Sequence, residues 1–75
     1  MGKLVIDRPG MTPFRVASIE AVDARIRQRY TGEPTVIVRP IARQEFAGAG
    51  IFLTPGDLFG YAESVELDTD FALRA

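Results

Sequence analysis

The chain has 75 residues, with 9 Lys or Arg against 10 Asp or Glu, no histidine and no cysteine, and its formal net charge is −1. This composition excludes disulfides and any metal site built on thiolate or imidazole ligands, and the short apolar runs argue against a membrane span. With 47% hydrophobic and 25% charged residues, we expect one folded domain, 1–75, with a small core.

The first elements read as a hairpin. Residues 3–7 are rich in β-branched side chains and predict a strand, and Pro9 and Gly10 follow as a turn. Within residues 13–17 the side chains alternate apolar and polar from Phe14 to Val16, which indicates a second, half-buried strand. Because proline donates no hydrogen bond to a ladder, this strand is expected to begin at Pro13 or to lie at an edge of the sheet.

Residues 18–31 predict the main helix. Ser18 is a favourable N-cap, and Ile19, Val22 and Ile26 repeat at helical spacing on one side. Gly32 then suits the C-terminal end of the helix.

The second half of the chain is less regular. Residues 35–39 predict a buried strand that ends or bends at Pro40, and residues 47–50 predict a turn. The segment between them, 41–46, is ambiguous, and a short edge strand is one interpretation. Residues 55–67 have two readings. Either Thr54 caps a helix, or a turn leads into a final strand over 64–68.

The main helix resembles that of ubiquitin. Ubiquitin's helix opens Thr-Ile-Glu-x-Val-x-x-Lys-Ile and closes with Gly-x-Pro; this chain has Ser18-Ile19-Glu20-Ala21-Val22-Asp23-Ala24-Arg25-Ile26 and then Gly32-Glu33-Pro34. The resemblance implies an α+β fold of the β-grasp superfamily, a mixed sheet of four to five strands with one main helix (18–31) on one face. The alternative is a ββα-ββα sandwich with a second helix at 55–67.

The resemblance also bears on function. β-Grasp proteins of this size are usually protein-binding modules or carriers, and the carriers end in Gly-Gly. This chain ends Phe71-Ala72-Leu73-Arg74-Ala75, so we expect neither conjugation nor sulfur transfer.

No catalytic, cofactor or metal site is predicted. The serines lack a histidine or cysteine partner, and Gly48-Ala49-Gly50 lacks the lysine and the following helix of a phosphate loop. The acidic stretch 66–70 lacks the glycine and distal glutamate of a calcium loop. We therefore expect no enzyme activity and no small-molecule substrate.

Exposed apolar surface is the remaining functional signal. Some of five large apolar residues exceed what a small core needs, and the group has two interpretations: a protein-binding surface, or a cap over the open end of the sheet. The five residues are Phe46, Ile51, Phe52, Phe59 and Tyr61. The sequence thus predicts a non-enzymatic module (adaptor, inhibitor or assembly factor, of the accessory or phage type) that binds a protein partner or forms a homodimer. The absence of cysteine suits the cytoplasm.

The alternative function is a nucleic-acid-associated regulator. Arg25 and Arg29 share one helix face, although the near-neutral net charge argues against nucleic acid as a partner.

Overall fold

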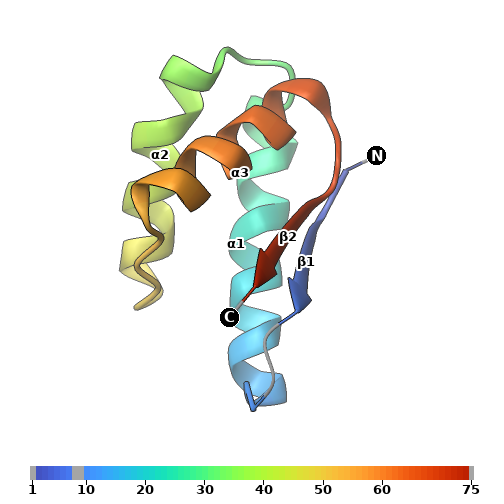
Figure 1. Ribbon diagram of the computed structural model, residues 1–75, viewed down its shortest axis with the longest axis vertical. Coiled ribbons are helices and arrows are strands. Elements are labelled where there is room, and N and C mark those ends of the chain that lie inside the picture. Colours follow the sequence, from blue (N-terminus) through green and yellow to red (C-terminus); the bar gives the residue numbers. More distant parts are fainter. Residues whose placement is uncertain (1, 8–9, 75) are drawn as a thin grey trace.

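The computed structural model describes residues 2–7 and 10–74. The elements follow the order β1 (Leu4–Asp7), α1 (Pro13–Tyr30), α2 (Thr35–Gly48), α3 (Pro55–Leu67) and β2 (Phe71–Arg74). Figure 1 shows α1 running along the molecule, with α2 on one side of it and the two strands on the other. Helix α3 crosses between these two sides.

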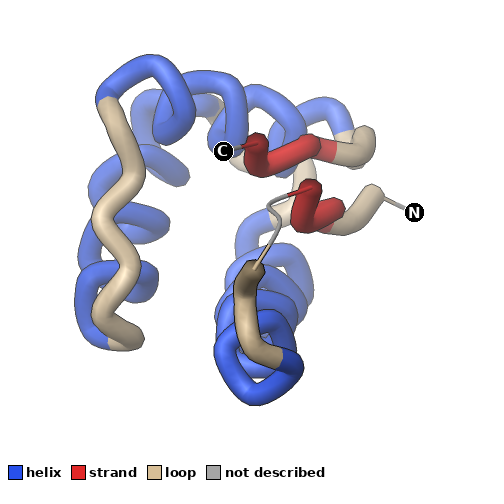
Figure 2. The backbone as a smooth tube through the Cα atoms, turned by 60° about the horizontal axis from the view of Figure 1, so that its bottom comes forward, coloured by secondary structure: helices blue, strands red, loops and turns tan. Residues whose placement is uncertain are grey.

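The two strands come from opposite ends of the described chain and pair in parallel, with Leu4 opposite Phe71 and Ile6 opposite Leu73. Figure 2 shows them side by side, away from the loop that joins α2 to α3. The side chains of Leu4 and Leu73 are buried, whereas the alternate residue Val5 is exposed. One face of this small sheet therefore closes the core and the other faces solvent.

Helix α1 begins five residues before the predicted start at Ser18. The Thr12 side chain accepts a hydrogen bond from the Arg15 N–H at 3.2 Å, and Pro13 occupies the first helical turn. Ser18 lies inside the helix, where its hydroxyl donates to the Phe14 carbonyl. The predicted strand at 13–17 is therefore wrong, because an N-cap followed by proline starts a helix there.

The buried stripe of α1 is as predicted, and the helix ends at Tyr30, one residue before the predicted end. Ile19, Val22 and Ile26 are buried along one stripe. Gly32 follows the helix with a φ of +89°, a left-handed conformation that glycine adopts without steric cost.

The predicted strands at 35–39 and 41–46 are also wrong, because both segments belong to α2. Val38, Ala42 and Phe46 are spaced four residues apart and form its buried stripe. Burial of this stripe outweighs the β-propensity of Val36, Ile37 and Val38, since propensity is a weak preference that tertiary contacts override. Pro40 lies inside the helix, on its exposed side.

The helix over 55–67 is confirmed. The Thr54 hydroxyl oxygen accepts from the Asp57 N–H at 3.1 Å, and Pro55 occupies the first turn. Asp68 adopts the left-handed conformation with φ 55° and ends the helix. The alternative reading, a strand over 64–68, is wrong, and Leu67 is exposed rather than inward.

The β-grasp fold and the ubiquitin-like resemblance are therefore contradicted. In place of a sheet of four to five strands with one helix, the described residues form three helices and a two-stranded parallel sheet. The ββα-ββα sandwich is absent from the same residues, although its second helix is present. The residues shared with ubiquitin are those that any amphipathic helix needs, so they carry no information about the strands around it.

The core is centred on Tyr61, whose ring meets Phe46 edge to face at 5.1 Å between centroids and Phe71 at 6.0 Å. These contacts join α2, α3 and β2. Within the described part of the chain, none of the helices has the length and apolar character needed to cross a membrane.

Candidate functional site

The five residues predicted to bind a protein partner fall into two groups. Phe46 is 1% exposed, and Ile51 and Tyr61 are also buried in the core. Phe52 is 82% exposed and Phe59 is 49% exposed. Only Phe52 and Phe59 are placed to contact another molecule.

Phe52 lies beside an apolar hollow. The hollow has a volume of about 340 Å³ and lies where the end of α2 meets the start of α3 and the loop between them. Its lining consists of Arg43, Ala47, Ile51, Phe52, Leu53 and Leu58. Since an apolar cavity of about 150 Å³ holds benzene, this hollow has room for an aromatic side chain.

An arginine side chain packs over the ring of Phe59. The guanidinium carbon of Arg39 lies 5.7 Å from the ring centroid, within the range of a cation–π contact. Glu63 follows Phe59 by one helical turn and is exposed, so it lies on the same side of α3. This contact joins an α2 cation to an α3 aromatic ring at the surface.

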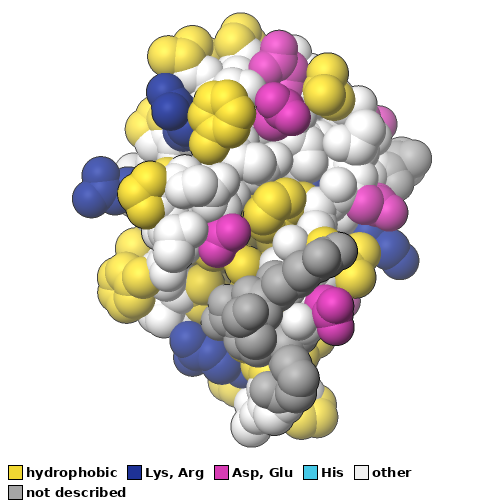
Figure 3. Space-filling model, in the orientation of Figure 1, with side chains coloured by type: hydrophobic (Ala, Val, Ile, Leu, Met, Phe, Trp, Pro, Cys, Tyr) yellow, Lys and Arg dark blue, Asp and Glu magenta, His cyan; other side chains and the backbone are white. Residues whose placement is uncertain are grey.

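These neighbouring groups form one surface, which we call the α2/α3 face. It consists of Arg39, Arg43, Phe52, Leu58 and Phe59, together with Glu63, which lies one helical turn after Phe59. Figure 3 shows hydrophobic side chains interspersed with Lys or Arg side chains over α2 and the loop that follows it. Aromatic and arginine side chains are the types that contribute most to protein interfaces.

The chain also contains a buried polar network. Asp23 Oδ1 accepts from Arg27 Nε at 2.7 Å and from the Tyr61 hydroxyl at 2.7 Å, and Asp23 Oδ2 accepts from the Leu4 N–H at 2.9 Å. Arg27 donates further to Ser64 Oγ and to the Thr69 carbonyl, each at 3.0 Å.

The network joins α1 to α3, β1 and the segment before β2. In the described residues no buried side-chain nitrogen or oxygen lacks a hydrogen-bond partner. Its groups are engaged with one another, so the network acts as a structural link rather than as a set of reactive groups.

Burial, and then the hydrogen bond to Asp23, raise the pKa of Tyr61 well above its ordinary value of 10.0. The folded protein thus keeps this hydroxyl protonated at a pH where the unfolded chain has lost the proton. The stabilisation is fully present below about pH 10 and is lost as the pH rises above that value toward the folded-state pKa.

We therefore expect Tyr61 to ionise only as the protein unfolds in alkali. In Tyr30→Phe, which leaves one tyrosine, the ultraviolet absorbance of tyrosinate should rise together with the loss of helical circular dichroism. An absorbance rise near pH 10 in a fully helical protein would contradict this assignment.

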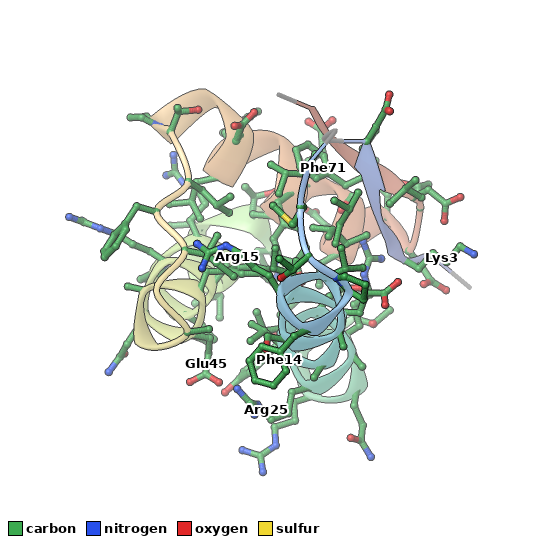
Figure 4. The ribbon with its side chains drawn as sticks, turned by 90° about the horizontal axis from the view of Figure 1, so that it is seen from below. Lys3, Phe14, Arg15, Arg25, Glu45 and Phe71 are labelled. Carbon is green, nitrogen blue, oxygen red and sulfur yellow. The ribbon has the colours of Figure 1, made fainter. Side chains whose placement is uncertain are left out.

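Arg25 and Arg29, the predicted nucleic-acid residues, line a small hollow of about 110 Å³ between α1 and α2. Arg25 forms a salt bridge with Glu45, Nη2 to Oε1 at 3.2 Å, and the two side chains lie close together in Figure 4. Glu45 offsets one of the two positive charges, so this face has little potential to attract phosphates.

Sequence reasoning missed the two arginines of the α2/α3 face. Arg39 and Arg43 are four residues apart and flank the buried stripe of α2. A helical reading of 35–48 places them together on one side, but the strand interpretation separated them.

Comparison with protein-family models, curated proteins and solved structures found no match to this chain.

Proposed function

We propose that this protein is a non-enzymatic protein-binding module that acts through the α2/α3 face. The observation that carries the proposal is Phe52, a phenylalanine with 82% of its surface exposed beside an apolar hollow. Phe59, with Arg39 on its ring, extends the same surface.

Energetics support a binding role for Phe52. Fully burying a phenylalanine side chain is worth about 1.5–3 kcal/mol, and Phe52 gains little of this within its own chain. The neighbouring hollow leaves the apolar side chains of Leu53 and Leu58 only partly covered. A partner that covers this surface would gain the burial energy that folding leaves unused.

The chemistry of the chain supports a role without catalysis. The sequence has no histidine or cysteine to act as a base or nucleophile. The buried ionisable pair, Asp23 and Arg27, is engaged in the link between α1 and α3. A chain without cysteine suits a reducing compartment, and we place the module in the cytoplasm.

Site-specific photo-crosslinking tests the proposal. A photoreactive phenylalanine analogue at position 52 should crosslink to a protein, either a second copy or another chain, in a lysate of the source cells. The same analogue at position 14 is the matched control, because Phe14 is 84% exposed but lies at the start of α1, outside the α2/α3 face.

We expect adducts from position 52 that excess unmodified protein suppresses, and few from position 14. Mass spectrometry of the adducts identifies the partner. Equal crosslinking at the two positions, or none at position 52, would contradict a binding role for this face.

A further inference from the structure

We propose that the occupant of the α2/α3 face is a second copy of this chain. The inference rests on the proposed function and names its partner. In the resulting twofold dimer, Phe52 of each copy enters the apolar hollow of the other.

Shape is the first argument. In a twofold interface the same patch meets itself, so that patch must carry both a projecting group and the recess that accepts it. The ring of Phe52 is 82% exposed and forms one wall of the hollow, whose other walls come from Arg43, Ala47, Ile51, Leu53 and Leu58, so the projecting group and the recess are adjacent. A different partner would need only one of these two features.

Charge is the second argument. The α2 side of the face carries Arg39 and Arg43, and the α3 side carries Glu63. A partner of one charge sign would complement only one side, whereas a second copy offers both signs. The net charge of −1 also adds little repulsion between two copies.

The arrangement of the helices allows the two signs to meet. Glu66 of α3 accepts hydrogen bonds from Thr35 at the start of α2, while the end of α2 and the start of α3 share the hollow. The two helices therefore run in roughly opposite directions. A twofold axis along their groove places α2 of each copy over α3 of the other, with arginines opposite Glu63.

The distribution of apolar surface is the third argument. Two of the seven large hydrophobic side chains that are exposed in the described residues, Phe52 and Phe59, lie on the α2/α3 face. A standard interface covers about 800 Å² on each partner, which is roughly one-sixth of the 4835 Å² surface of this chain.

Sedimentation equilibrium over a range of concentrations tests the dimer. We expect wild-type protein to approach twice the 8.2 kDa chain mass as its concentration rises. Phe52→Asp should weaken the dimer at least about tenfold, the equivalent of about 1.4 kcal/mol. Phe14→Asp, which changes an equally exposed ring at the start of α1, should leave the dimer unchanged.

Circular dichroism of both variants establishes that the helices remain formed.

Phe14 is a suitable control position. In Figure 4 the Phe14 and Arg15 side chains point in different directions from the start of α1. Arg15 reaches the loop after α2 through its bond to the Gly50 carbonyl. Equal weakening by Phe52→Asp and Phe14→Asp would overturn the assignment to the α2/α3 face.

Charge reversal tests the twofold arrangement itself. The double variant Arg39→Glu/Arg43→Glu and the variant Glu63→Arg should each form weaker homodimers. A mixture of the two should form a heterodimer tighter than either homodimer, because opposite charges meet again. A mixture that associates no better than its components would overturn the proposed pairing.

The dimer and the proposed function fail in different ways. Wild-type protein that remains monomeric at about 1 mM, a concentration that detects even weak association, overturns the dimer. If position 52 still crosslinks to another protein, the binding function stands with a different partner. Protein that stays monomeric and forms no such crosslinks overturns both the dimer and the binding function.

Discussion

Asp23→Ala is expected to lower the free energy of unfolding by about 3–5 kcal/mol, the usual cost of removing one partner of a buried ion pair. The substitution leaves the Arg27 guanidinium, the Tyr61 hydroxyl and the Leu4 N–H without the carboxylate that each of them bonds. Since a chain of this length has a stability of about 4–11 kcal/mol, this loss is a large share of the total and should move the unfolding transition to a much lower urea concentration.

Urea denaturation followed by circular dichroism measures this effect, and Glu20→Ala is the matched control. Glu20 is an exposed carboxylate on the same helix, and its removal should change the stability by no more than about 0.5 kcal/mol.

The double variant Asp23→Leu/Arg27→Leu separates lost charge pairing from lost packing. The double variant removes both charges, so no unpaired charge stays buried. Its free energy of unfolding should therefore lie above that of Asp23→Ala. A loss below about 1 kcal/mol in Asp23→Ala, or a double variant less stable than the single one, would contradict the structural role of the network.

Pro40→Ala is expected to stabilise the protein by about 2 kcal/mol. Proline in a helix interior costs about 3 kcal/mol, because it lacks an N–H and its ring meets the preceding turn. Alanine also gives the unfolded chain more conformational freedom than proline does, and this lowers the gain in stability by up to about 1 kcal/mol. Because position 40 is on the exposed side of α2, the substitution removes no core contact.

Thermal unfolding is a sensitive measurement of this gain, since 1 kcal/mol shifts the Tm of a domain this small by about 4–8 °C. Pro55→Ala is the control: Pro55 begins α3, where no helical hydrogen bond is lost to proline, and its replacement should bring no gain. A Pro40→Ala variant no more stable than wild type would show that α2 has adapted to its proline.

Much of the helical structure, but not the sheet, could be read from local signals. The Ile19, Val22 and Ile26 stripe, the glycine after α1 and the Thr54-Pro55 start of α3 each depend on residues a few positions apart. The same kind of signal, Thr12-Pro13, marks the true start of α1. There the alternation over 14–16 predicts a strand, whereas the Thr12 cap and Pro13 start the helix.

The candidate site could be located only in the folded structure. Phe46, Phe52 and Phe59 are residues of the same type, but Phe46 completes the buried stripe of α2 while the other two remain at the surface. Reading residues 35–46 as strands hid this difference, because alternation along a strand and the four-residue spacing of a helix place different residues inward.

The sequence alone determined that the chain has no thiol or imidazole side chain, that a strand lies near its N-terminus, and which residues form the buried stripe of its first helix. These depend on composition or on contacts between near neighbours. Tertiary structure decided that residues 35–48 are helical, because burying Val38, Ala42 and Phe46 outweighs local β-propensity. It also decided that Leu4 pairs with Phe71, since partners so far apart in the chain are chosen by the helices packed between them and not by any local pattern.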